Sequence, residues 1–307
     1  MKKSTKPKKF SLLPIIIFLI AVAAYFLFTP GQYHASFTDG SGAAIEITKR
    51  PARVVSLVPA ITEIIFKVGA EETLKGVTEH DKLPAGAPPR KIMGGFFSPD
   101  IEKIKEINPD VIFVSSLHEE VREEFGDRAI LIELDAHSVQ DIYENISIIG
   151  MVFEVEDNAL RTIDNIKKEF TATANKVEAI PEVAKKRTVR LMGGDSVMVP
   201  GDDSFQNSYI RAAGGIPPVL NKTGNVVPIT KEEWINFNPQ VIYACNKESR
   251  AAGIIQSEPG WKDVDAVREG KIFYFPCDLT CRASINAGNF VSWLSSRIYK
   301  DAFLKKE

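Results

Sequence analysis

One short pattern occurs twice in the chain. Residues 107–114 read Ile-Asn-Pro-Asp-Val-Ile-Phe-Val, residues 237–244 read Phe-Asn-Pro-Gln-Val-Ile-Tyr-Ala, and a glutamate, Glu102 or Glu232, lies six positions before each Asn-Pro. Proline disfavours helical geometry in the residue before it, so each copy predicts a short helix that stops at Asn-Pro and a buried strand that follows. A chain with two such α/β units has a natural place for a ligand in the groove between them.

Length, composition and charge fit a globular protein with room for two domains. The chain has 307 residues, of which 44% are apolar and 25% charged, and its formal net charge is −2. Five lysines precede the first apolar run, so the remainder of the chain carries a net charge of −7. A nucleic-acid partner is therefore not expected.

An almost unbroken apolar stretch, residues 12–28, follows these lysines. It is longer than the core of a typical signal peptide, about 7–15 residues, and shorter than the roughly 20 residues that span a membrane. We expect either a cleaved export signal or a retained anchor in the inner membrane, and no nearby cysteine offers a site for lipid attachment. The lysines should stay cytoplasmic, which places the chain from about Thr29 onward in the periplasm or another extracytoplasmic space.

Strands and helices alternate in two parts of the chain. The alternation over about residues 50–137 predicts a lobe built on a parallel sheet. Strands predicted at residues 188–191, 241–245 and 271–275 give a second lobe with the same order. Between the lobes, apolar spacing predicts a helix over residues 157–179, and its 23 residues would extend about 35 Å. That helix can carry the chain from one lobe to the other, or cover a sheet face, or do both.

The predicted fold class is therefore α/β, with two parallel-sheet lobes joined by a long backbone helix and a ligand cleft between the lobes. The expected divisions are a signal peptide or anchor at 1–31, an N-terminal lobe at 32–138, a connecting helix at 139–185 and a C-terminal lobe at 186–307.

In parallel α/β sheets, ligands bind beyond the carboxyl ends of the strands. This rule gives candidate ligand-binding residues on the loops of both lobes: Pro59, Ala60, His80, Phe96, Phe97 and Ser115 in the first, and Asp278 and Arg282 in the second.

Three of the four histidines, His80, His118 and His137, fall on the same loops. A metal held by the protein alone would need about four ligands from both lobes, and the second lobe has no histidine. We expect no such metal site and no cofactor, although His80 or His118 could supply one axial bond to the metal of a bound chelate.

No catalytic motif follows any predicted strand. Ser56 and Ser196 lack the Gly-x-Ser-x-Gly elbow, no phosphate-binding loop is present, and no nucleophile is paired with a base. The sequence therefore predicts a binding protein and not an enzyme.

The three cysteines are Cys245, Cys277 and Cys281. An exported chain permits one disulfide and leaves one thiol, whereas a Cys-x3-Cys spacing does not match common zinc sites. We expect a disulfide between Cys277 and Cys281 ahead of one between Cys245 and Cys277, and either would lie beside the cleft.

Several segments together resemble the family of cobalamin, haem and ferric-siderophore receptors that feed ABC importers. The segments are residues 53–63, residues 98–102 with the strand that follows them, residues 201–205, and Asp278 with residues 282–284. The resemblance runs from about Phe37 to the C-terminus. It implies two lobes joined by a backbone helix, a metal chelate in the cleft, and a permease with its ATPase as partners.

The resemblance also gives roles to single residues. His80 stands where the cobalamin receptors of this family have a tyrosine, Phe96 where they have a tryptophan, and Arg282 where they also have an arginine. Ser115 replaces a second tryptophan, which is a departure from the pattern. The permease-docking glutamates of the family correspond to Glu102 and Glu232.

The function predicted from the sequence is capture of a metal chelate, in the first place a cobalamin or other corrinoid, and its delivery to a permease. A ferric siderophore or haem is the alternative within this class, and a siderophore would need cationic groups such as Arg250 or Arg282 in the cleft. A ligand-sensing module or a chelatase-like enzyme on the same fold is the alternative from another class, because fold does not fix function.

Overall fold

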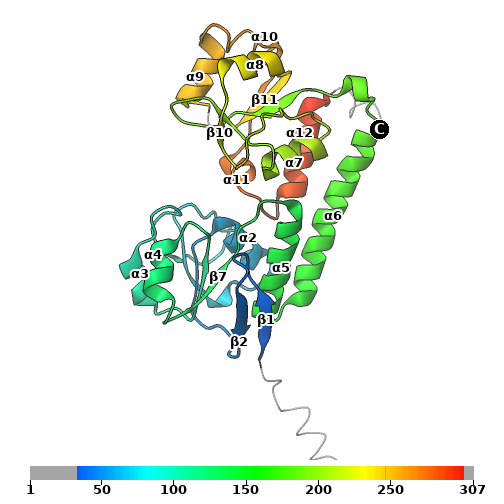
Figure 1. Ribbon diagram of the computed structural model, residues 1–307. Coiled ribbons are helices and arrows are strands. Elements are labelled where there is room, and N and C mark those ends of the chain that lie inside the picture. The colour runs from blue at the N-terminus through cyan, green and yellow to red at the C-terminus, as the bar shows by residue number, and fades with distance from the viewer. Residues whose placement is uncertain (1–32, 246, 301–307) are drawn as a thin grey trace, which may run out of the picture.

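The computed structural model of the chain describes residues 33–245 and 247–300. Two lobes lie one above the other, and the long helix α6 (Glu156–Glu178) runs along both of them (Figure 1). The apolar stretch at residues 12–28 lies outside the described residues. Among the described helices, none combines the length and the apolar character that crossing a membrane requires.

The N-terminal lobe is built on a five-stranded parallel sheet in the order β5-β4-β3-β6-β7. Its central strands are buried on both faces, as parallel sheets covered by helices require. The strands are β3 (Val54–Ser56), β4 (Leu74–Val77), β5 (Lys91–Ile92), β6 (Val111–Val114) and β7 (Ile130–Glu133); an antiparallel hairpin of β1 (Ala35–Thr38) and β2 (Ala44–Ile47) precedes them. The helices are α2 (Pro59–Val68), the 3-10 turn η1 (Glu71–Thr73), α3 (Ile101–Ile107), α4 (Glu119–Phe125) and α5 (Val139–Phe153).

The C-terminal lobe has a smaller parallel sheet in the order β12-β11-β8. Its strands are β8 (Thr188–Arg190), β11 (Val241–Ala244) and β12 (Ile272–Tyr274), with an antiparallel pair of β9 (Met198–Val199) and β10 (Val227–Pro228) beside them. The helices are the 3-10 turn η2 (Glu182–Ala184), α7 (Phe205–Ala212), α8 (Lys231–Phe237), α9 (Arg250–Ser257), α10 (Asp265–Arg268), α11 (Cys277–Thr280) and α12 (Ala287–Ile298). The α/β class with two parallel-sheet lobes is thus confirmed.

The repeated Asn-Pro pattern is a repeat of structure as well. Asn108 ends α3 and Asn238 ends α8, and both adopt the left-handed conformation, with φ of 49° and 44°. Asparagine tolerates this conformation better than most residues with a side chain. The two asparagine carbonyls accept hydrogen bonds from Arg53 Nε and Arg187 Nε, which lie just before β3 and β8 respectively. Each unit is therefore tied to the first strand of its own lobe's parallel sheet in the same way.

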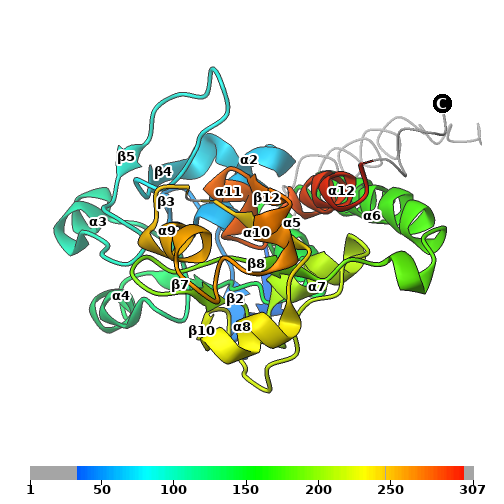
Figure 2. The same ribbon diagram turned by 90° about the horizontal axis from the view of Figure 1, so that it is seen from above.

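Helix α6 is packed closely against one helix from each lobe. It contacts α5 and α12, and α12 lies beside it in both views (Figures 1 and 2). Each neighbour presents a glycine at the contact: a Cβ added at Gly150 would lie 2.7 Å from Ala159 Cβ, and one added at Gly288 would lie 2.6 Å from Glu169 Cβ. The largest apolar cluster runs without a break from α5 through Ile166 of α6 to α12. The expected connecting segment at 139–185 thus contains two helices, of which only α6 passes between the lobes.

Candidate functional site

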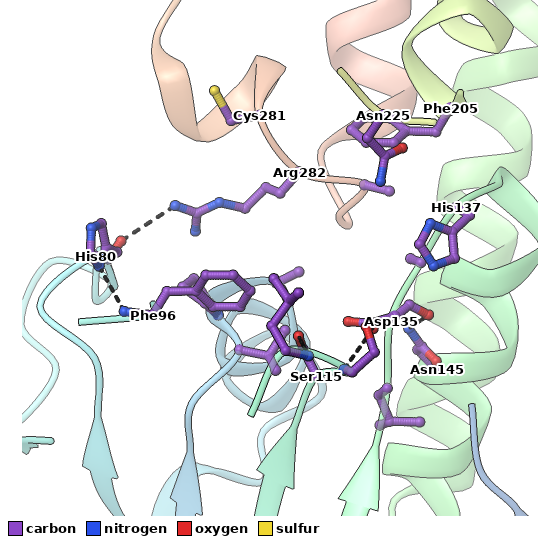
Figure 3. A pocket seen from close by; sticks show the side chains of 18 of the residues that line it. His80, Phe96, Ser115, Asp135, His137, Asn145, Phe205, Asn225, Cys281 and Arg282 are labelled. Atoms are coloured by element: carbon purple, nitrogen blue, oxygen red, sulfur yellow. Dashed lines mark hydrogen bonds between the residues drawn. The ribbon is translucent and has the colours of Figure 1, made fainter. Parts of the chain in front are cut away.

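A cavity of about 430 Å³ opens between the lobes at the carboxyl ends of β3, β6 and β7 (Figure 3). Its volume is in the range of clefts that hold small ligands. The N-terminal lobe supplies most of the lining, and the C-terminal lobe supplies five residues. The lining residues are Val58, Pro59, Ala60, His80, Phe96, Phe97, Ser115, Ser116, Leu117, Leu134, Asp135, Ala136, His137, Asn145, Phe205, Asn225, Cys281, Arg282 and Ala283.

The rule that ligands bind beyond the carboxyl ends of parallel strands (the strand-end rule) located part of this lining. Seven residues that it predicted line this cavity: Pro59, Ala60, His80, Phe96, Phe97, Ser115 and Arg282. Asp278 is not among the lining residues, and its carboxylate faces Lys82 of the other lobe at 3.2 Å.

Apolar side chains stand uncovered at the opening of the cavity. The Phe96 and Phe97 rings meet edge to face with centroids 4.8 Å apart. Phe97 is 81% exposed and Leu117 is 63% exposed. Large apolar groups gathered at a concave surface indicate a binding site, because covering them removes apolar area from water.

His118 holds the loops of the site together and does not line the cavity. Its side chain is buried, with 3% exposed, and its Nδ1 accepts a hydrogen bond from the Ser115 backbone N–H at 3.1 Å. The ring is therefore protonated on Nε2, which donates to the Phe96 carbonyl at 2.7 Å. Burial lowers the pKa of His118 and favours this neutral form. With both ring nitrogens hydrogen-bonded, His118 acts as a structural residue here, which leaves His80 as the other histidine that the sequence offered as an axial ligand.

His80 and His137 remain beside the cavity. They lie on opposite sides of it, His80 on the loop after β4 and His137 on the loop before α5 (Figure 3). His80 Nδ1 accepts a hydrogen bond from the Phe96 N–H at 3.2 Å, so Nε2 is the ring nitrogen left for another contact.

Arg282 is already paired across the cleft. Its Nη1 donates to Glu63 Oε1 of α2 at 2.9 Å, and its Nη2 donates to the His80 carbonyl at 3.3 Å. Asn286 donates to the other Glu63 oxygen at 3.3 Å. Burial raises the pKa of Glu63, and the charge of Arg282 opposes that shift. The guanidinium expected to face a ligand thus has a carboxylate as its partner.

Asp135 gives the lower part of the cavity its charge. Its Oδ2 accepts hydrogen bonds from the backbone N–H and the hydroxyl of Ser116, at 2.9 and 2.7 Å. Asn145 donates to the Asp135 carbonyl at 3.3 Å. Within residues 33–245 and 247–300, no lysine or arginine forms an ion pair with the Asp135 carboxylate. The cavity therefore contains the Asp135 carboxylate and the Asn145 amide, and the charge of Arg282 at its side is offset by Glu63.

Three side chains of the lining, Asn145, Phe205 and Asn225, were not among those that the strand ends selected. Asn145 lies within α5. Phe205 begins α7 and belongs to the segment 201–205 that carried the family resemblance, which was the available signal. Asn225 lies in a connection with no pattern that marks it.

The disulfide joins Cys245 to Cys277, with Cα atoms 4.8 Å apart, and Cys281 is free. The preferred pairing of Cys277 with Cys281 is thus wrong, and the second pairing considered is the one formed. Cys245 and Cys277 follow β11 and β12, which are neighbouring parallel strands. Cys277 and Cys281 are instead separated by the single turn of α11, where the Cys281 N–H donates to the Cys277 carbonyl at 2.8 Å.

Glu102 and Glu232 occupy matching places in the two lobes. Each lies in the first turn of its helix, α3 or α8, and each is exposed. Glu102 also forms an ion pair with Lys105 at 3.0 Å. Their role in docking stays a prediction.

Comparison with known proteins finds relatives of low identity over most of the chain. Residues 54–279 match the family described as periplasmic binding protein. An uncharacterised ABC transporter substrate-binding lipoprotein of Bacillus subtilis (strain 168) is 23% identical over 278 residues, covering 88% of this chain and 87% of the relative. The vitamin B12-binding protein of Salmonella typhi is 23% identical over 212 residues, covering 68% of this chain and 77% of the relative.

A solved structure shows the same fold. The apo form of the periplasmic haem-binding protein RhuT from Roseiflexus sp. RS-1 aligns with a TM-score of 0.70 and 21% identity, over 81% of this chain and 98% of that one.

Proposed function

Because the chain belongs to the family of periplasmic binding proteins, we propose that it is the extracytoplasmic solute-binding component of an ABC importer and that it delivers a corrinoid to its permease. The family and the lipoprotein relative support the transport role. The vitamin B12-binding relative and the chemistry of the cavity support the corrinoid.

The observation that carries the ligand assignment is the charge of the cavity. Arg282 is the only lysine or arginine in the described lining, and its charge is offset by Glu63. Asp135 adds a carboxylate without a cationic partner among the described residues. A corrinoid such as cyanocobalamin has no net charge and carries a rim of neutral amides, so it suits a cavity that has no free cation in its described lining. Haem carboxylates and the acidic groups of many ferric siderophores do not.

The polar and apolar groups of the cavity match the two parts of a corrinoid. The Phe96 and Phe97 rings, with Leu117, offer area to the face of a macrocycle. Asn145 and Asn225 offer amide donors and acceptors to the side chains of its rim. A few such polar groups in an apolar cleft fix the orientation of a ligand.

Haem is the second candidate, and the two histidines on opposite sides of the cavity favour it. His80 Nε2 would then supply the axial bond. A ferric siderophore is the third, and it requires Arg282 to leave Glu63. A chelatase-like enzyme or a sensing module would be distinguished by product formation or by a partner other than a permease.

The predicted partners are a permease and its ATPase. Glu102 and Glu232 supply the docking charges in this proposal, because charge pairs at an interface set register and speed encounter. Residues 12–28 would provide export and, if retained, an anchor in the inner membrane.

Calorimetric titration tests the ligand assignment directly. Cyanocobalamin, haemin and ferrichrome are titrated separately into the exported protein at neutral pH. Heat with cyanocobalamin and none with the other two is the expected result. Heat with haemin alone, lost in His80→Ala, would move the assignment to haem, and silence with all three would reject the metal-chelate proposal.

A further inference from the structure

Three sulfur atoms gather at the base of the C-terminal lobe, where β11 and β12 end. The Sγ atoms of Cys245, Cys277 and Cys281 all lie within 4.8 Å of one another. The free Cys281 Sγ is 3.6 Å from the Sγ of Cys245, which is bonded to Cys277. Cys277 and Cys281 are exposed and Cys245 is half-buried. A free thiol is thus in contact with a disulfide at a place that small molecules can reach.

A buried arginine accompanies the free thiol. Arg190 at the end of β8 is only 2% exposed, and its Nη2 donates to Cys281 Sγ at 3.1 Å. Its Nη1 donates to the Thr280 carbonyl, and its Nε has no partner within the described part of the chain. No carboxylate of residues 33–245 and 247–300 forms an ion pair with it. A buried cation without a carboxylate therefore has its charge directed at the sulfur of Cys281.

That arrangement fits the requirement of thiol–disulfide exchange. The attacking species is a thiolate, and negative charge spreads over three sulfurs as one bond forms and another breaks. A fixed, buried guanidinium in contact with one of these sulfurs stabilises this charge.

We infer that Cys281 and the neighbouring disulfide form a thiol–disulfide exchange site, in which Cys281 replaces Cys277 as the partner of Cys245. The electron pair of the Cys281 thiolate forms the new bond to Cys245 Sγ. The bond between Cys245 and Cys277 breaks, and its electron pair goes to Cys277. The proton that Cys281 gave to water returns to Cys277, so the step needs neither oxidant nor reductant.

The exchange would be transmitted to the ligand cleft through α11. Cys281 is followed by Arg282, which pairs with Glu63 of the other lobe, and Cys277 is followed by Asp278, which pairs with Lys82. The cavity itself reaches Cys281. Moving the bond from one end of α11 to the other shifts both cross-lobe ion pairs, so the two disulfide isomers present different clefts. The exchange chemistry itself does not depend on which ligand the protein carries.

Peptide mapping of the disulfide tests this inference. The purified exported protein is incubated at neutral pH with a trace of reduced glutathione, quenched with acid and N-ethylmaleimide, and digested without reduction. Trypsin alone leaves Cys277 and Cys281 in one peptide, residues 272–282, but Asp-N cleaves between them before Asp278. The two digests together therefore distinguish the isomers by mass.

Cys277→Ser supplies the reference for the exchanged isomer, and Cys281→Ser is the matched control that cannot exchange. We expect wild type to give linked peptides of Cys245–Cys277 and of Cys245–Cys281, and Cys277→Ser to give only the latter with no free thiol. Cys281→Ser should keep Cys245–Cys277 throughout. Wild type that stays wholly Cys245–Cys277 overturns the inference, whatever the variant shows. Circular dichroism of each variant verifies that its fold is retained.

Discussion

Arg282, just after α11 in the C-terminal lobe, donates a hydrogen bond to the Glu63 carboxylate on α2 of the N-terminal lobe, at 2.9 Å. The two side chains are 219 positions apart in sequence and mostly buried. Burial raises the pKa of Glu63 and the charge of Arg282 opposes that shift, so the arginine offsets only part of the cost of burying the ionised carboxylate. The pair therefore joins the two lobes across the cleft.

The pairing predicts that loss of Arg282 lowers the stability more when Glu63 is present than when Glu63 has been replaced. Arg282→Gln leaves a buried carboxylate without its cation and should lower the free energy of unfolding by about 1–3 kcal/mol at neutral pH. In a Glu63→Gln background the same substitution should cost at least about 1 kcal/mol less. Urea unfolding of the four proteins in the cycle measures both values. Equal costs in the two backgrounds would contradict the coupling. Loss of the exposed Arg128–Glu124 pair by Arg128→Gln, expected to cost under about 1 kcal/mol, is the control.

A pH dependence follows from the same carboxyl group. Because the pKa of Glu63 is raised in the folded protein, the unfolded chain loses this proton first as the pH rises above the ordinary value of 4.5. The stability of wild type relative to Glu63→Gln should be highest below pH 4.5 and should fall as the pH passes through the folded-state pKa. Unfolding curves at several pH values test the sign. A stability advantage of wild type over Glu63→Gln that grows with pH would show that Arg282 lowers the pKa of Glu63 overall.

Phe96 should contribute directly to ligand affinity. Phe96→Ala removes a ring from the wall of the cavity and should weaken cyanocobalamin binding by about 1–3 kcal/mol, which is roughly 5- to 150-fold. Calorimetric titration of wild type and variant provides the measurement. Val183→Ala, a truncation at an exposed side chain away from the cavity, should bind as wild type does. Equal affinities for wild type and Phe96→Ala would place the ligand elsewhere.

As proposed docking residues, Glu102 and Glu232 should affect transport and not binding. Glu102→Lys combined with Glu232→Lys reverses one charge on each lobe, and uptake through the cognate transporter should be lost while ligand affinity is unchanged. Transport in reconstituted vesicles, beside titration of the free protein, separates the two effects. Glu106→Lys, which reverses an exposed charge at the other end of α3, serves as the control. Full uptake by the double variant would show that these two glutamates act only as favourable charges at the starts of their helices.

The parts of the fold that depend on local pattern were predictable. The helix expected at residues 157–179 is α6 at Glu156–Glu178, because its apolar period is regular and Pro181 ends it. The capping box of Thr230 and Glu233 is present at the start of α8. The strand-end rule found the cavity because it depends only on the order of strands and helices.

The features that were missed depend on contacts between distant segments. No local pattern links Glu63 to Arg282, so the charge state of the cavity was not predictable. His118 was one of two possible axial ligands because its loop follows a predicted strand, but its hydrogen bonds to Ser115 and Phe96 required coordinates. The disulfide depended on the spacing of two parallel strands, which the distance between cysteines in sequence does not report.

The packing of α6 limits how this receptor can discriminate among molecules of different size. Gly150 and Gly288 let one helix from each lobe approach α6 closely, and the apolar cluster continues through all three helices. Opening the lobes by a large angle would separate these helix contacts and expose apolar surface. The width of the cleft between the two lobes therefore stays nearly constant. A bulkier or smaller ligand cannot be matched by swinging the lobes. Adaptation to another ligand must instead come from substitutions in the loops that carry Phe97, Leu117 and Asn225, while the frame behind them remains the same.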